Sequence, residues 1–286
     1  MSIGDITLTA AMRSNLFSLQ QTNELTGRTQ ERLATGKRVN SALDNPANFF
    51  AARGHTQRAD LLNGLKDNIS EAIQTVKVAD NAVTAINKSL EQLRGVLTQA
   101  REALNSTTSG TQLSGLTQQY NEIIRQINNL GADASYKGVN FLAGTGITLT
   151  VNFNEEASTS LVMRGFNGSA SGLALSGGTQ SGSGTLATAN IDTAGEIDNV
   201  EATINSAIAT LRTRSGELAA NLSILTTRQE FITKMVNTLV EGATKLTVAD
   251  TNEEGANMLA LQTRQQLGVT SLALASQAAQ AVLRLF

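Results

Sequence analysis

Apolar residues recur at alternating steps of three and four through a long central stretch of the chain. All eleven stripe positions over five heptads are apolar: Ile69, Ala72, Val76, Ala79, Val83, Ile86, Leu90, Leu93, Leu97, Ala100 and Leu104. Such a sustained heptad pattern is typical of a coiled-coil seam. It predicts a helix about 54 Å long, given the rise of about 1.5 Å per residue. A shorter stripe predicts a further helix after a turn at 105–110, with positions Leu116, Tyr120, Ile123, Ile127 and Leu130.

A second long stripe occupies the C-terminal half of the chain. Its positions are Ile204, Ile208, Leu211, Ser215, Leu218, Leu222, Leu225, Gln229, Ile232, Val236, Leu239, Ala243 and Leu246. The helix it predicts is about 64 Å long. Because the two long helices match in length and have no other obvious partner, we expect them to form an antiparallel coiled coil within one chain.

Both chain ends carry weaker stripes. The N-terminal positions are Leu8, Met12, Asn15, Leu19, Thr22, Thr26, Thr29 and Leu33, and the C-terminal positions are Met258, Leu261, Gln265, Gly268, Leu272, Ala275, Ala279, Val282 and Phe286. Polar and small residues make such a seam poorly stable in isolation. We expect the end helices to become ordered against partners, with packing of Phe286 into its own domain as the alternative.

Two segments interrupt the helical pattern. Asn45 suits an N-cap and Pro46 the first helical position, so a helix should begin near 46 after a break over 34–45. Asn63-Gly64 is a candidate for another interruption. Residues 147–153 and 158–163 alternate at period two around a turn, which predicts a β-hairpin, and 167–190 indicate a flexible or weakly β surface loop.

The predicted fold class is therefore mainly α. A long antiparallel coiled-coil helical hairpin has both termini paired at one end, and a small β-hairpin with a Gly-, Ser- and Thr-rich segment forms its tip. The composition adds that few side chains of this chain could take part in a reaction or bind a metal. Its 286 residues include no Cys, no Trp, one His and 3% aromatic residues. Thiolate chemistry and multi-His metal sites are excluded, and an enzyme is disfavoured.

The remaining candidates for chemistry are weak. His55 has no cluster of carboxylates around it, and Glu155-Glu156 are expected to lie in a solvated turn. The glycines of 165–184 match no phosphate loop. Basic residues near the N-terminus alternate with acidic ones, and the net charge is −2, which gives no field for nucleic acid. We predict no catalytic, cofactor-binding or metal-binding residue, and no nucleic-acid partner.

No segment reaches about 18 uninterrupted apolar residues, so no membrane insertion is expected. The first ten residues lack the basic start and apolar stretch of a cleavable secretory signal. These first residues are compatible with export by a route that uses no cleavable signal.

Three segments resemble those of bacterial flagellins. Residues 32–47, RLATGKRVNSALDNPA, are similar to the family's N-terminal signature, and 136–142, YKGVNFL, to a downstream segment. Residues 275–286, ASQAAQAVLRLF, resemble the family's closing segment. The resemblance covers about 1–143 and 197–286, and the DNPANFF variant resembles flagellins of alphaproteobacteria.

The resemblance implies three domains: a terminal coiled-coil domain of 1–45 with 246–286, a helical rod of 46–143 with 197–245, and a short outer insertion, 143–196. It implies a subunit that polymerises into the extracellular flagellar filament for motility. It also implies export through the hollow flagellum by the type III apparatus, with an export chaperone, filament cap and hook-junction proteins, and other flagellins as partners.

We place the polymer interface on the end helices and the first linker. The candidates are Leu8, Met12, Leu16, Leu19, Arg32, Leu33, Arg38, Asn40, Asp44, Met258, Leu261, Leu272, Val282, Leu283 and Phe286. Alternative functions are a hook–filament junction protein of flagellin-like architecture, and, further away, a coiled-coil adaptor or surface adhesin. Gln92 and Gly95 depart from the residues of receptor-activating flagellins, so recognition by the innate flagellin receptor is not expected.

Overall fold

A computed structural model of the chain describes residues 10–105, 109–175, 180–181, 185–186, 191 and 193–283. The chain divides into two compact units. One unit combines the chain up to Ala59 with the chain from Asn237 onward, and the other is residues 60–236. The two units are described separately below.

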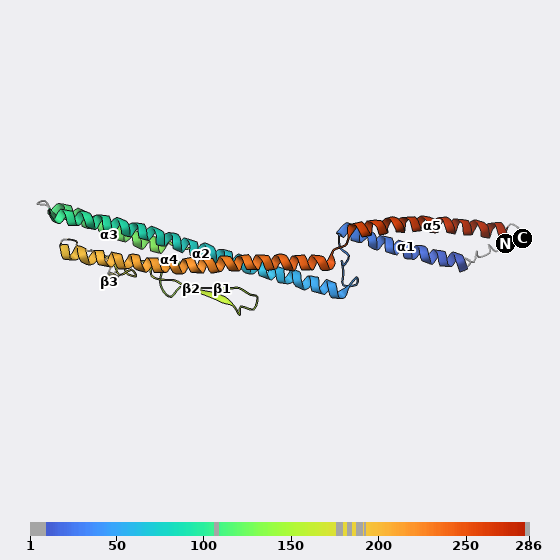
Figure 1. Cartoon of the computed structure of the whole chain (residues 1–286), viewed down its shortest axis with the longest axis horizontal. Helices are drawn as coiled ribbons and strands as arrows, with labels where there is room; N and C mark the ends of the chain where they lie inside the picture. The colour runs from blue at the N-terminus through green and yellow to red at the C-terminus, as the bar shows by residue number, and fades with distance from the viewer. Residues whose placement is uncertain are drawn as a thin grey trace. The chain divides into compact units, whose positions relative to one another are not determined.

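The central unit is built on the greater part of two long helices that run antiparallel and side by side (Figure 1). These are α2, Pro46–Leu104, and α4, Ala194–Thr247. In the contacts between them, residue numbers rise along α2 as they fall along α4. Gln229 donates to Ser70 at 2.7 Å, Ser215 donates to Asp80 at 3.0 Å, and Arg101 pairs with Asp198 and Glu201. The predicted intrachain coiled coil is confirmed.

The predicted seams are the buried faces of these helices. Ten of the eleven stripe positions on α2 are buried, and the last, Leu104, is half-buried where the helix ends. None of the thirteen positions on α4 is exposed. The interruption expected at Asn63-Gly64 was wrong, because α2 continues through it. A single helical glycine costs only about 1 kcal/mol relative to alanine, which the burial of neighbouring Leu62 can offset.

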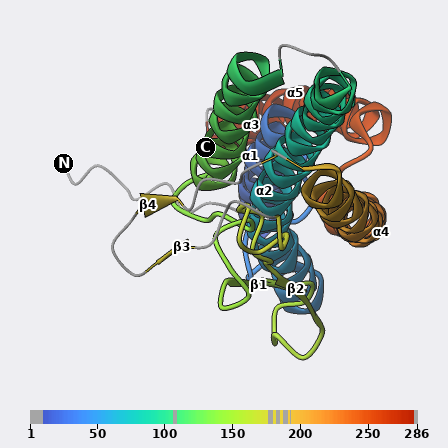
Figure 2. The same cartoon turned by 90° about the vertical axis from the view of Figure 1, so that its left-hand side faces the viewer.

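A third helix, α3 (Ser109–Asp133), lies against this pair, as the end-on view in Figure 2 shows. Its buried face centres on Leu113, Tyr120, Ile124 and Ile127. Ile123, which the sequence pattern placed in the stripe, is only half-buried, so the contact face is turned slightly from the one expected.

A hairpin and two short strands follow α3. Strands β1, Thr148–Asn152, and β2, Ser160–Arg164, pair antiparallel with Thr150 opposite Val162, which confirms the predicted β-hairpin. In the weakly β loop, β3 (Gln180–Ser181) pairs with β4 (Thr185–Leu186). The hairpin segment lies against α4, because two arginines of α4 stack on its aromatic rings. The guanidinium carbon of Arg228 is 5.0 Å from the centre of the Phe153 ring, and that of Arg214 is 5.7 Å from the centre of the Phe166 ring.

A tight turn holds the start of this segment against α2. Lys137 and Gly138 both have positive φ, and the backbones of Tyr136 and Val139 exchange two hydrogen bonds across them. The Lys137 ammonium then lies 2.8 Å from Glu71 of α2. This hydrogen bond lowers the pKa of the Glu71 carboxyl below its ordinary value.

The terminal unit pairs the two end helices, α1 (Ala10–Thr35) and α5 (Thr251–Leu283), in antiparallel order (Figure 1). Asn15 donates to Ser271 at 3.1 Å near one end of the pair. Farther along, the Leu19 side chain fills the space that Gly268 leaves without a Cβ. The expected pairing of the two chain ends is therefore observed over the described residues.

Two linkers of this unit hydrogen-bond to each other. The first, 36–45, joins α1 to α2, and the second, 248–250, joins α4 to α5. The Arg38 amide donates to the Thr247 carbonyl at 2.7 Å, and the Ala249 amide to the Gly36 carbonyl at 3.0 Å. Gly36 has a φ of +66°, which suits glycine and allows the chain to leave α1 at this point. The break predicted over 34–45 is confirmed, with α2 beginning at Pro46.

Two glycines should respond oppositely to alanine. A Cβ at Gly165 would lie 2.7 Å from the Phe141 carbonyl oxygen, whereas a Cβ at Gly95 on α2 would meet nothing within 4 Å. We expect Gly165→Ala to destabilise the chain by about 1–3 kcal/mol, and Gly95→Ala to stabilise it by about 0.5–1 kcal/mol. Urea unfolding followed by circular dichroism measures both. A shift of the same sign in the two variants would contradict this assignment.

Candidate polymer interface

The seam between α1 and α5 is polar on the α1 side. Thr22, Thr26 and Thr29 are buried there. The Thr22 and Thr26 hydroxyls donate to the carbonyls one turn earlier, each at 2.8 Å, so no polar partner from α5 is needed. Hydroxyl groups satisfied by their own helix add little attraction across the seam. The side-chain hydrogen bonds described between the two end helices are those of Asn15 with Ser271 and of Arg32 with Glu254.

The strongest of these contacts is an ion pair near the linkers. The Arg32 guanidinium donates to the Glu254 carboxylate at 2.9 Å, joining the last turn of α1 to the first turn of α5. Glu254 is buried, and Arg32 is mostly shielded from water. A carboxylate in the first turn of a helix is also favoured by the helix dipole. This pair fixes the end of the helical pair that adjoins the linkers.

Removing the arginine should loosen the helix pair locally. Arg32→Ala leaves the Glu254 carboxylate buried without its cation, which we expect to cost on the order of 2 kcal/mol, less than for a fully buried pair. Faster amide hydrogen exchange in α1 and α5 measures the effect. Arg28→Ala removes an exposed pair with Glu24 and should change the exchange little. Equal protection in Arg32→Ala and the unchanged chain would refute the role of this pair.

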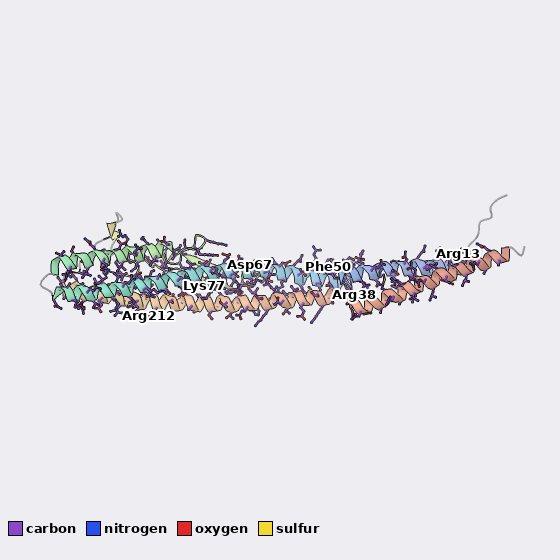
Figure 3. The ribbon with its side chains drawn as sticks, turned by 90° about the horizontal axis from the view of Figure 1, so that it is seen from above. Arg13, Arg38, Phe50, Asp67, Lys77 and Arg212 are labelled. Atoms are coloured by element: carbon purple, nitrogen blue, oxygen red, sulfur yellow. The ribbon has the colours of Figure 1, made fainter. Side chains whose placement is uncertain are left out.

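The linker 40–45 is ordered around one carboxylate. Asp44 Oδ2 accepts from the amides of Asn40 at 3.1 Å and Ser41 at 2.9 Å, and from the Ser41 hydroxyl at 3.1 Å. These hydrogen bonds, the backbone ones first, lower the pKa of Asp44 below its ordinary value, and the charge of Arg32 adds to the effect. Arg38 and Phe50, labelled in Figure 3, belong to the same region and are exposed.

Apolar side chains also cover the outward faces of the end helices. Exposed large apolar residues on α1 and α5 are Leu16, Phe17, Leu259, Leu267, Val269 and Leu274. Between residues 255 and 283 the sequence holds one charged residue, Arg264. A helix that is apolar on both faces is normally buried on both. One face of α5 is covered by α1, and the other is available to a partner.

The sequence-derived candidates fall into three groups. Met12, Leu19, Leu33, Met258, Leu261 and Leu272 are buried or half-buried on the seam within the chain. Leu16 and Arg38 are exposed, and Arg32, Asn40 and Asp44 make the contacts given above. Leu8 and Phe286 lie outside the described residues, as do the side chains of Val282 and Leu283.

Sequence reasoning therefore selected mostly seam residues and passed over the outward ones. Phe17, Leu259, Leu267, Val269 and Leu274 lie one or two positions away from the stripes on which the helix prediction rested. For the residues on α5, the signal that could have identified them is the scarcity of charge after its first turn, where Arg264 is the one charged residue between 255 and 283. Leu43, in the linker, carried no periodic signal at all.

The other candidates for chemistry lie apart from one another in the chain. His55 is half-buried on α2, with Gly242 as its neighbour on α4. Glu155 and Glu156 are exposed in the hairpin turn. Within the described ranges, no three His, Asp or Glu side chains are grouped so as to hold a metal ion. The same residues include no helix long and apolar enough to cross a membrane.

A predominantly helical chain whose end helices expose large apolar side chains has the surface of a protein that associates with other proteins. The family comparisons agree with this interpretation. The model of the bacterial flagellin N-terminal helical region matches residues 6–146, and that of the bacterial flagellin C-terminal helical region matches residues 200–286. Together the two matches cover most of the chain. The chain belongs to the bacterial flagellin family, whose members are structural subunits of the flagellar filament.

Individual relatives span the same length. The chain is 28% identical to flagellin FljM of Caulobacter vibrioides over the whole of both chains. It is 26% identical to a flagellin of Brucella melitensis over 95% of each. Both organisms are alphaproteobacteria, in line with the resemblance carried by the DNPANFF segment.

The fold is also found among solved structures. A putative flagellar hook-associated protein from Vibrio parahaemolyticus aligns with a TM-score of 0.56 and 12% identity, over 72% of this chain and all of that one. At this identity the likeness concerns the fold alone.

Proposed function

We propose that this chain is a filament-forming subunit that adds to the end of a growing helical polymer in the extracellular flagellum. The observation that carries the proposal is the outward face of α5, where Leu259, Leu267 and Leu274 are exposed on a helix nearly free of charge. Burying one such side chain against a neighbouring copy stabilises the contact by about 1.5–3 kcal/mol. A charge-poor face of this length favours repeated self-association over solubility.

We assign the contacts that build the polymer to the terminal unit. Contacts on the outside of the polymer are assigned to the rest of the chain. The proposed division has a terminal domain of 1–45 with 246–286, a rod of 46–143 with 197–245, and an outer insertion of 143–196. The helix breaks at 36–45 and 248–250 support the first boundary. The few strong contacts across the α1–α5 seam support end helices that gain order in the polymer.

The weakly held ends also suit a route of secretion that threads the chain through the hollow filament. We propose export by the flagellar type III apparatus with an export chaperone. The filament cap, the hook-junction proteins and other flagellins are the proposed neighbours of the exported subunit. Helices that separate at low cost lower the work of unfolding the chain for such passage.

Polymerisation from seeds tests the proposal. Short sheared filaments are mixed with purified monomer, and growth is followed by light scattering and negative-stain electron microscopy. A filament subunit elongates the seeds in proportion to the monomer supplied. A hook–filament junction protein of the same architecture would bind at most once per seed end, and an adaptor would leave the seeds unchanged. Seeds that fail to lengthen would overturn the proposal.

A further inference from the structure

The linker between α1 and α2 presents a leucine to solvent on a fixed loop. Leu43 is 96% exposed, the highest exposure among the large apolar side chains of the described residues. Its loop is held on both sides: Asp44 accepts the hydrogen bonds given above, and Asn45 caps α2 by accepting from the Asn48 amide at 3.0 Å. The Leu43 amide also donates to the Ser41 hydroxyl at 3.3 Å. Leu43 is thus held in place before any partner binds.

The same unit contains a groove that fits an apolar side chain. Its volume is about 400 Å³, and it lies between the start of α2, the end of α4 and residues 37–40. The apolar lining consists of Val39, Phe49, Ala52, Val240 and Ala243. Val39, Ala52 and Ala243 are buried, whereas Val240 is half-exposed at the opening. Covering the apolar surface that such a groove leaves open to water is favourable, because it removes that surface from contact with water.

Charge around the groove is of one sign. Lys37 and Arg53 line it, and no acidic residue does. The residue next to the exposed leucine is acidic, since Asp44 follows Leu43 in the linker. Leu43 and Asp44 together offer an apolar side chain and a negative charge, and the groove offers an apolar surface and two positive charges. The two surfaces are complementary in both respects.

The chain does not fill the groove with its own leucine. Asn40 lines the groove, and Leu43 is only three residues away, yet almost the whole Leu43 side chain remains exposed. A second copy is the occupant to expect, because the flagellin family self-polymerises. Since leucine and groove are different surfaces of one copy, a contact between two copies leaves one groove and one leucine of the pair unused. Such heterologous contacts propagate into an open filament unless their rotation closes a ring.

We propose that Leu43 of one copy inserts into the groove of a neighbouring copy, with Asp44 facing Lys37 and Arg53 across the contact. This contact rests on the proposed filament function and names one pair of surfaces that builds the polymer. The hydrogen-bonded loop keeps the entropy lost on insertion small, because the backbone around Leu43 is already ordered.

Directed crosslinking tests the contact, and the absence of cysteine from the chain makes it specific. One variant carries Leu43→Cys and another Val240→Cys, and the two are copolymerised on seeds and treated with a short bismaleimide. We expect dimers from the mixture and none from either variant alone. A chain carrying both substitutions should give a ladder of dimers and higher multiples, because every copy then has one donor and one acceptor surface.

A second measurement tests the energetics. Leu43→Glu should raise the monomer concentration needed for elongation by about tenfold or more, and Leu43→Met by less than about twofold. Arg53→Glu should act in the same direction as Leu43→Glu. Circular dichroism of the monomers should be unchanged, because both side chains are exposed.

The two proposals fail differently. Seeds that do not grow with the unchanged chain overturn the filament function and with it this contact. Normal filaments that give no dimers from the Leu43→Cys and Val240→Cys mixture, and that form equally well from Leu43→Glu, overturn the contact and leave the filament function standing.

Discussion

A chain carrying Leu267→Glu and Leu274→Glu is expected to remain a folded monomer at concentrations where the unchanged chain extends seeds. In the monomer these side chains are 66% and 61% exposed, so the glutamates stay in water and the fold is little affected. In a polymer that covers this face of α5, two carboxylates per subunit lose their hydration. The cost of several kcal/mol for each buried charge exceeds what the lost leucine contacts supplied.

Sedimentation of polymer from monomer, followed by electron microscopy, measures the loss. The matched control is Leu267→Met with Leu274→Met, which keeps the apolar face and should polymerise normally. Monomer folding is checked by thermal unfolding of all three proteins. Filaments of ordinary length from the glutamate variant would show that the outward face of α5 remains in water, and the central observation behind the filament proposal would be lost.

The largest effect on monomer stability is expected at the seam between α2 and α4. Leu225 of α4 is 0% exposed, and Leu225→Ala should destabilise the chain by about 2–5 kcal/mol through lost burial and the cavity left behind. Its neighbour Ile224 is 43% exposed on the same helix. Ile224→Ala should change the free energy of unfolding by no more than about 0.5 kcal/mol, as surface substitutions usually do.

Urea unfolding, monitored by circular dichroism, compares the two variants. The adjacent residues differ by one step of about 100° around the helix, so their position along α4 is nearly the same and they differ mainly in the face they occupy. A difference between them measures the seam itself. Similar losses for Leu225→Ala and Ile224→Ala would contradict the packing of α4 against α2.

Periodicity predicted the long helices because their seams are long enough to outweigh local preferences. The eleven apolar positions of α2 lie on one face of the helix, so only that face could be the buried one. The two polar positions of the α4 stripe, Ser215 and Gln229, form hydrogen bonds with polar residues of α2. Asn63-Gly64 misled because a turn-forming pair acts locally, whereas the flanking buried residues hold the helix continuous. On α3 the stripe included Ile123, which is half-buried, and passed over its neighbour Ile124, which is buried.

The candidate interface was less predictable than the fold. Stripe positions such as Met258 and Leu272 were chosen for being apolar at helical spacing, and that spacing brings them to the seam inside the chain. An outward apolar residue such as Leu267 has the same chemistry, and only the position of α1 shows that it is left uncovered. Leu43 and its groove come from different segments, and no spacing along the chain connects them.

By itself, the sequence determined the helical class, the antiparallel coiled coil, the hairpin, the start of α2 and the family, because these follow from local patterns and from motifs at both chain ends. The tertiary structure alone decided which apolar residues are covered. Burial depends on the neighbour that a side chain meets, and residues distant in sequence supply that neighbour: Glu254 contacts Arg32 and Gly268 contacts Leu19, whereas Leu43 stays 96% exposed among the described residues.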